Sequence, residues 1–240
     1  MLKVYRIVPF ARPKEGRHKA YACLCIKKPD EQSFAFDNFV GIRLREKWRT
    51  PTLYFDRPLR PKPDFPLLGI GFACNERAMG ISRQLLDSSV EFLPAKVEGE
   101  SQPYFVFNPI VVGDFLNREK TVFATPSNEM KEILKELIAA GKNLNLFVAP
   151  AFDPDKVRDL SVFRIQESNK EIYCVEDETN PSLGFKGIVE QNSLTGLRFD
   201  LAWTEATGAI PLTFPPMEAG AKWITGDGNE FPNWKTYRPA

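Results

Sequence analysis

Proline limits what this sequence can fold into more than any other residue. The chain contains 20 prolines in 240 residues, compared with a usual frequency of about 5%. Proline lacks a backbone N–H and interrupts both helix interiors and central strands. This content therefore argues against a bundle of long helices and favours short strands joined by loops. The hydrophobic fraction of 43% is that of an ordinary globular protein, which excludes a disordered or fibrous chain.

Most of the predicted elements are short strands. They are recognised by apolar alternation and by runs of β-branched or aromatic residues. Residues 2–8 are predicted to form an edge strand. Further strands are expected at 20–26, 52–55, 91–97, 104–112, 144–148, 161–165, 172–175 and 196–203. The proline-rich stretch 60–66 is predicted to be a stiff connection.

Three segments have helical patterns. The strongest covers residues 126–140, with Pro126 at the first helical position and Gly141 as the C-terminal cap. Its apolar stripe consists of Met130, Ile133, Leu134, Leu137 and Ile138. A second helix is expected to begin after Asn75, which can act as its N-cap. A short helical turn is expected at 185–191.

Helices and strands do not alternate regularly, so the expected fold class is α+β with a mostly antiparallel sheet and a few packed helices. The length is consistent with one or two domains. We expect a single domain over residues 1–240, with two sub-lobes meeting near 60–75 as an alternative. Residues 205–240 are rich in proline and glycine but contain Trp223 and Trp234. We expect them to form an irregular arm packed on the body.

Charge is distributed unevenly along the chain. The formal net charge is only +1, but residues 1–62 contain 15 Lys and Arg against 6 Asp and Glu. One interpretation is a basic surface that binds a partner. The other is mutual attraction between a basic first part and an acidic remainder. The overall balance argues against a protein dedicated to nucleic acid or to a membrane surface.

The most suggestive local pattern is the basic segment 43–49. Arg43, Arg45, Lys47 and Arg49 alternate with other residues, which would place four cations on one face of a strand. With the adjacent Trp48 they are the candidate partner-binding residues. An acidic protein partner fits this pattern, and so does the acidic remainder of the chain. The alternative is that Trp48 belongs to the core and the cations are merely solvated.

The sequence contains no pattern of metal ligands and no cofactor motif. The one histidine, His18, is expected in an exposed loop, so a cluster of histidines is impossible. The cysteines have neither C-x-x-C nor zinc-site spacing and are predicted to be buried and reduced. They are Cys23, Cys25, Cys74 and Cys174. No phosphate-binding or dinucleotide-binding glycine motif occurs, so no cofactor is expected.

Evidence for catalysis is equally limited. The local carboxylate pairs are Asp153 with Asp155 and the acidic run 176–178, and we interpret both as solvated loops. No secretory signal is visible, and the longest uncharged apolar stretch, 67–74, is far shorter than the ~20 residues of a membrane-spanning helix. We therefore expect a cytoplasmic protein that does not bind membranes.

Several segments resemble a family of binding proteins. Residues 85–94 and 104–109 are similar to a helix–strand–strand block of the immunity proteins of bacterial polymorphic toxin systems, in the class named immunity protein eleven. Residues 159–174 are similar to the second block of that family, and residues 188–199 to its closing helix and strand. Further residues in a similar order are Gly41, Trp48, Pro51, Asp64 and Phe65. The similarity covers roughly residues 36–204.

The resemblance implies a cytoplasmic, non-catalytic immunity protein that binds and neutralises a cognate toxin protein of the same bacterium. The family supplies no active-site residues, so none is assigned, and no cofactor, metal or nucleic acid is implied. Two alternatives remain open. One is an enzyme that acts on small molecules or glycans through paired carboxylates. The other is a nucleic-acid binder that uses the basic N-terminal third.

Overall fold

The computed structural model describes residues 1–9, 22–27, 41–57, 60–69, 71–125, 147–211 and 222–225. In these residues strands predominate over helices, and most neighbouring strands are antiparallel, which confirms the predicted α+β class. The helix predicted at 126–140 lies outside the described residues, as does His18.

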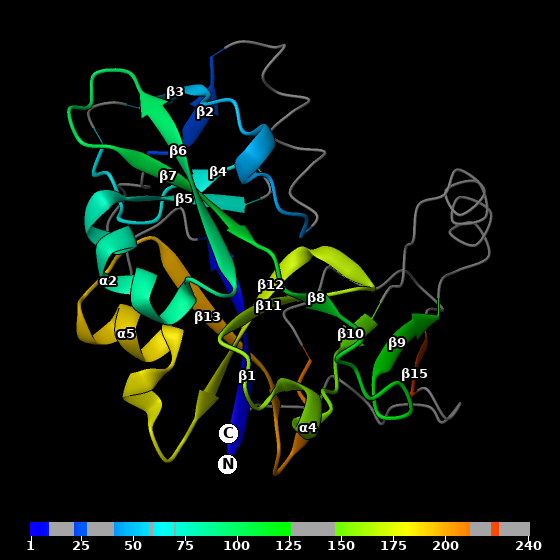
Figure 1. Cartoon of the computed structure of the whole chain (residues 1–240). Helices are drawn as coiled ribbons and strands as arrows, with labels where there is room; N and C mark the ends of the chain where they lie inside the picture. Colours follow the sequence, from blue (N-terminus) through cyan, green and yellow to red (C-terminus); the bar gives the residue numbers. More distant parts are fainter. Residues whose placement is uncertain are drawn as a thin grey trace.

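Six short strands form a closed barrel at the top of Figure 1. In order around the barrel they are β2 (Leu24–Ile26), β3 (Thr52–Phe55), β6 (Val90–Val97), β7 (Tyr104–Pro109), β5 (Gly71–Asn75) and β4 (Leu67–Leu68). Leu53, Leu93 and Val106 belong to its buried core. The sequence predicts most of these strands but not the barrel. Closure depends on two short parallel pairings, β2 with β4 and β3 with β6, and apolar alternation does not encode them.

A six-stranded sheet lies below the barrel and contains the N-terminal strand near its centre. The order is β14 (Gly208–Ala209), β13 (Leu197–Thr204), β1 (Leu2–Pro9), β12 (Ser168–Asp177), β11 (Val162–Ile165) and β8 (Val112–Gly113). The prediction of an edge strand at 2–8 is wrong, because β1 pairs with β12 on one side and β13 on the other. Val4 faces one core cluster and Tyr5 the other, so both faces of β1 are covered.

Two helices pack together on the left of Figure 1, one against the barrel and the other against the sheet. They are α2 (Glu76–Leu86) and α5 (Phe185–Gln191), and α5 is preceded by the 3-10 turn η2 (Pro181–Leu183). Both helices occupy predicted positions, and the Asn75 side chain accepts a hydrogen bond from the Ala78 N–H at 2.9 Å, as expected of an N-cap. Fully buried Phe65 packs edge-to-face on Phe72 and Phe185. The barrel, the helices and the sheet therefore share one hydrophobic core.

Asp64 connects the barrel to the loop before β13 through hydrogen bonds. Its carboxylate accepts hydrogen bonds from the Thr195 N–H at 2.9 Å and hydroxyl at 3.0 Å, and from Asn75 Nδ2 at 3.0 Å. Burial alone would raise the pKa of Asp64. The hydrogen bonds from Thr195 and Asn75 and the charge of Arg77, whose Nη1 lies 3.1 Å from the carboxylate, outweigh burial and lower this pKa overall.

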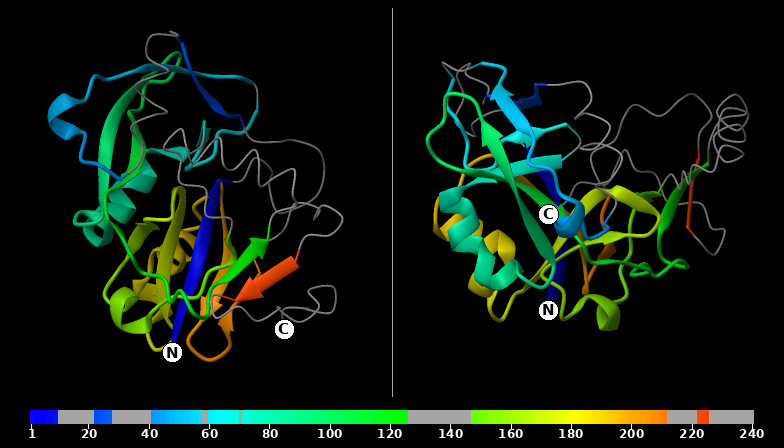
Figure 2. Two further views of the ribbon diagram at one scale, coloured as in Figure 1. Left: turned by 90° about the vertical axis from the view of Figure 1, so that its right-hand side faces the viewer. Right: turned by 45° about the horizontal axis from the view of Figure 1, so that its top comes forward.

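The opposite face of the sheet is covered by α4 (Pro154–Val157) and by the segments around Leu116 and Phe152. A separate three-stranded sheet consists of β10 (Phe147–Ala149), β9 (Val122–Thr125) and β15 (Lys222–Thr225), and Figure 2 shows β15 beside β9. The region 205–240, predicted to be irregular, thus contains two short strands, β14 and β15. Most of it beyond residue 211 lies outside the described residues.

Candidate functional site

The segment with the candidate residues Arg43, Arg45, Lys47, Trp48 and Arg49 does not form a strand. It contains one 3-10 turn, η1 (Arg45–Lys47), with non-helical residues on either side. The prediction that strand alternation places the four cations on one face is therefore wrong. The physical reason is that, within the described part of the chain, this backbone bonds within η1 and to the Glu91 side chain of β6, and it pairs with no strand. All four cationic side chains are nevertheless exposed, and Trp48 is half-buried.

The Glu91 carboxylate fixes the start of this segment. Glu91 is buried in β6, and its Oε2 accepts hydrogen bonds from the Leu44 N–H at 2.7 Å and from Asn108 Nδ2 at 3.1 Å. Its Oε1 lies 3.4 Å from the Arg45 backbone nitrogen. These N–H groups lie at the start of η1, where a helical turn has no partner of its own for them. Glu91 therefore fixes the position of the backbone from which the side chains of Arg43 and Arg45 project into solvent.

Trp48 fixes the other end of the turn. Its indole Nε1 donates a hydrogen bond to the Pro94 carbonyl oxygen at 2.7 Å. Its ring packs against the hydrophobic core of the barrel, so the hypothesis that Trp48 belongs to the core is correct for part of its surface. The remaining surface of Trp48 lines a cavity. The turn is thus bound to β6 at two points, Glu91 and Pro94.

The groove between η1 and α2 has a volume of about 470 Å³. Strand β6 passes between α2 and the light-blue turn η1 in Figure 1, and it provides the floor of the groove. The η1 side contributes Arg43, Arg45 and Trp48. The structure therefore brings three of the five candidate residues together. Lys47 and Arg49 are exposed but do not line the groove.

The floor and the far wall come from residues that the sequence did not single out. Phe92 of β6 and Phe105 of β7 lie on the floor, and Phe92 packs edge-to-face on core residue Phe107 at 5.7 Å. Met79, Arg83 and Asp87 line the far wall. Their spacing of four residues would have placed them on one face of a helix, but nothing local indicates that this face lies across β6 from η1.

Most other described cations of the first 62 residues have acidic partners later in the chain. The Nζ of Lys3 lies 2.6 Å from Glu178, and Arg6 forms ion pairs at 3.2 Å with both Glu171 and Asp200. Lys27 pairs with Glu98, and Lys62 with Glu100. The attraction between a basic first part and an acidic remainder is therefore present. Among the described residues, however, no acid pairs with the side chains of Arg43, Arg45, Lys47 or Arg49.

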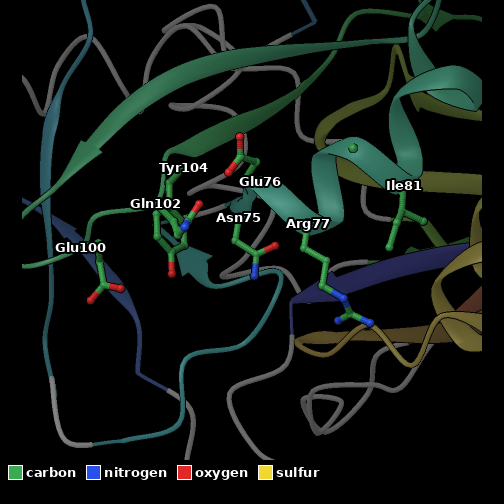
Figure 3. A pocket seen from close by; sticks show the side chains of 8 residues that line it. Asn75, Glu76, Arg77, Ile81, Glu100, Gln102 and Tyr104 are labelled. Atoms are coloured by element: carbon green, nitrogen blue, oxygen red, sulfur yellow. The ribbon is translucent and has the colours of Figure 1, made fainter.

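A second cavity of about 470 Å³ lies at the start of α2. Figure 3 shows the carboxylates of Glu76 and Glu100, which line it, pointing in different directions. Glu100 pairs with Lys62, and Arg77 donates to the Asn192 carbonyl at 2.7 Å in addition to its contact with Asp64. Burial, followed by the charges of Glu100 and Asp64, raises the pKa of Tyr104 to about 12. The polar groups of this cavity do not converge on one point.

The acidic residues considered for catalysis have structural partners. Asp153 caps α4, and its side chain accepts a hydrogen bond from the Asp155 N–H at 3.2 Å. The interpretation of the acidic run 176–178 as a solvated loop is wrong for Glu176, which is buried near the end of β12. It accepts hydrogen bonds from the Tyr5 hydroxyl at 3.3 Å and from Lys186 at 3.2 Å. The described part of the chain contains no group of three or more His, Cys, Asp or Glu residues arranged to hold a metal ion.

The cysteines divide into two pairs. Cys74 and Cys174 are buried, as predicted, and burial raises the pKa of both thiols. Cys23 and Cys25 are only partly buried, so the prediction is wrong for them, because β2 lies at the surface of the barrel on that side. None of the helices in the described ranges is both long and apolar enough to cross a membrane.

No protein-family model matches this sequence, and no curated protein sequence matches it significantly. The arrangement of the groove residues is therefore the main guide to its chemistry. An apolar floor between guanidinium groups suits a ligand that has both an apolar part and negative charge.

Proposed function

We propose that this chain is a non-catalytic immunity protein of the bacterial cytoplasm that binds and neutralises a cognate toxin. Two lines of support carry the proposal. One is the resemblance over roughly residues 36–204. The other, and the decisive one, is the set of four exposed cations at Arg43, Arg45, Lys47 and Arg49, which have no acidic partner among the described residues. They lie on a turn that is bound firmly to the barrel.

A protein of this kind works by occupying the active site of the toxin or by holding the toxin in an inactive conformation. Both require a surface that is formed before binding, because ordering a loop on contact costs affinity. Glu91 and Trp48 provide such preorganisation for the basic segment. Arginine and tryptophan are the residues most often found to dominate binding energy at protein interfaces. Unpaired positive charge also accelerates encounter with an acidic partner.

The distribution of charge favours a protein partner over nucleic acid. Nucleic acid binds along continuous basic surfaces, with an affinity that falls steeply with salt. Here Lys3, Arg6, Lys27 and Lys62 are paired with acids of the same chain, whereas no acid pairs with the four cations of the segment 43–49 among the described residues. A short cationic patch beside apolar side chains matches the polar rim and apolar centre of a protein interface.

The test is co-expression with the toxin-like product of a neighbouring gene. We expect growth of the host to be rescued and the two proteins to co-purify at equal stoichiometry. Arg45→Glu combined with Arg49→Glu should weaken toxin binding by at least about tenfold and reduce its dependence on salt. A charge-matched control, Arg57→Glu with Lys120→Glu, should bind as the wild type does.

Two outcomes would contradict the proposal. Absence of binding to, and protection from, any neighbouring toxin would remove the immunity function. If far less than one molecule of this chain per toxin molecule protects the host, and the toxin or its product is chemically altered, the chain is an enzyme instead. Titration of the toxin with the purified chain, followed by mass spectrometry of the toxin, separates these cases.

A further inference from the structure

We infer that the groove between η1 and α2 binds an acidic segment of the partner protein, with one large apolar side chain seated on the floor and carboxylates held by Arg43, Arg45 and Arg83. This inference rests on the proposed function and specifies which part of the surface recognises the partner, and by what chemistry.

The floor of the groove is suited to an apolar side chain. Phe92, Phe105 and Met79 are each partly exposed, and all three pack from behind against the central hydrophobic core. The half-buried ring of Trp48 forms the edge. A volume of about 470 Å³ lies in the range of known ligand pockets, and it accommodates an aromatic or leucine side chain together with adjacent backbone. Burial of such a side chain would remove apolar surface from water on both partners.

The rim is suited to carboxylates. Arg43, Arg45 and Arg83 lie on opposite walls, and a guanidinium group can hold a carboxylate through two parallel hydrogen bonds. Arg83 contacts Asp87 at 3.8 Å, but both side chains are more than half exposed, so this ion pair is weak and readily exchanged for a ligand. Glu91, the other acid of the groove, already accepts a hydrogen bond from the backbone at the start of η1. The arginines are thus available for acidic groups from outside.

The extent of the charge indicates a polypeptide segment. Lys47 and Arg49 continue the basic surface beyond the groove, where a small anion seated on the floor would not reach them. An extended or helical segment with acids on both sides of one apolar residue can contact the groove and these two cations together. A DNA duplex would present phosphates to the groove while its bases stay stacked and paired, and it would leave the apolar floor unfilled, so the arrangement favours protein over a duplex.

The first experiment selects ligands without assuming the toxin. Random dodecapeptides displayed on phage are selected on the immobilised full-length chain. The enriched peptides are then synthesised and measured by fluorescence polarisation. We expect peptides with at least two Asp or Glu residues around a Trp, Phe or Leu. Arg45→Glu with Arg83→Glu should weaken their binding at least about tenfold, and Met79→Ala about threefold or more. The control Arg57→Glu with Lys120→Glu should change it less than about twofold.

The matched control keeps the test independent of folding and of total charge. Both double variants lower the net charge by the same amount, and each changes one arginine that contacts an exposed acid and one cation without an ion pair in the described residues. Circular dichroism and thermal melting verify that each variant is folded. Selection of peptides without acidic residues would overturn the inference. So would equal affinity of the groove variant and the control, or tighter groove-dependent binding of a DNA duplex at physiological salt.

A second measurement distinguishes failure of the inference from failure of the proposed function. If the cognate toxin binds the Arg45→Glu, Arg83→Glu variant as tightly as the wild type, the groove inference is wrong while the immunity function stands. If acidic peptides bind through the groove but no neighbouring toxin is neutralised, the immunity function is wrong while the preference of the groove for acidic segments stands.

Discussion

Removal of the Glu91 carboxylate should loosen the basic segment without changing any of its cations. Glu91→Ala leaves the Leu44 N–H without its acceptor at 2.7 Å and takes one of two acceptors from Asn108 Nδ2, which also donates to the Ile42 carbonyl at 3.0 Å. Glu91→Gln keeps one carbonyl oxygen for these donors. It replaces the other oxygen, near the Arg45 N–H, with an amide group that cannot accept.

The expected cost follows from these contacts. An unsatisfied buried donor costs about 1–3 kcal/mol, and a hydrogen bond to a charged group contributes about 1.5–3 kcal/mol. For Glu91→Ala, the loss at Leu44 and the weakened position of Asn108 together lower the free energy of unfolding by about 3 kcal/mol. Glu91→Gln retains some of these hydrogen bonds, so it should lower the free energy of unfolding by only about 1–2 kcal/mol. Glu98→Ala, whose carboxylate pairs with Lys27 at the surface, should cost less than about 1 kcal/mol.

Two measurements check this prediction. Urea denaturation gives the change in the free energy of unfolding, and hydrogen exchange gives the local protection of the amides of Leu44 and Arg45. We expect faster exchange at these amides in both Glu91 variants and no change in Glu98→Ala. Toxin or peptide binding should weaken in Glu91→Ala although Arg43, Arg45 and Arg83 are intact. Unchanged exchange at Leu44, with a stability loss no larger than that of the Glu98 control, would refute the positioning role of Glu91.

Four further predictions test the fold. Asp64→Asn should cost about 2–3 kcal/mol at neutral pH. Because the folded-state pKa of Asp64 lies below its ordinary value, its stabilisation is present above that value and is lost as the pH falls through the folded pKa, so urea denaturation should show a flatter acid dependence in the variant. Gly80→Ala should raise stability by about 0.5–1 kcal/mol, since no atom lies within 4 Å of an added Cβ in this helix. Gly187→Ala should lower it by about 2–4 kcal/mol, because the Cβ would lie 2.0 Å from the Pro181 carbonyl oxygen; thermal melts compare the two. Cys74 and Cys174 should react with a thiol reagent only on unfolding, whereas the cysteines near β2 react in the native protein.

Two described helices with local signals are predicted correctly from the sequence. Helix α2 begins where Asn75 offers a cap, and α5 occupies the predicted residues 185–191, because capping and helical spacing are properties of adjacent residues. The central position of β1 and the closure of the barrel depend instead on pairings between distant segments. Alternation in a strand shows that it has an apolar face but does not show how many neighbours pair with it.

The candidate site also has one part that local sequence predicts and another part that only the tertiary fold creates. The exposure of Arg43, Arg45, Lys47 and Arg49 follows from residue type, so it could be predicted even though the predicted strand is wrong. The groove could not, because Arg83 and Phe92 come from elements brought beside η1 only by the tertiary fold. The role of Glu91 could not be predicted either, since a glutamate in a mostly apolar strand gives no indication that it binds the backbone of a segment 47 residues away.

The basic segment is the place where the requirements of folding and of binding diverge. Four like charges within seven residues repel one another, and solvent screens but does not abolish that repulsion. Glu46 lies among them, but in the described part of the chain it forms no ion pair with any of the four. A chain under selection for stability alone would gain from such pairs or from a flexible backbone that lets the charges separate. Here Glu91 and Trp48 hold the backbone in place, and acids such as Glu178 and Glu100 pair with other cations of the chain. A rigid backbone that holds unpaired cations close together lowers the stability of the fold slightly. The same arrangement becomes favourable when a bound partner supplies negative charge to these cations.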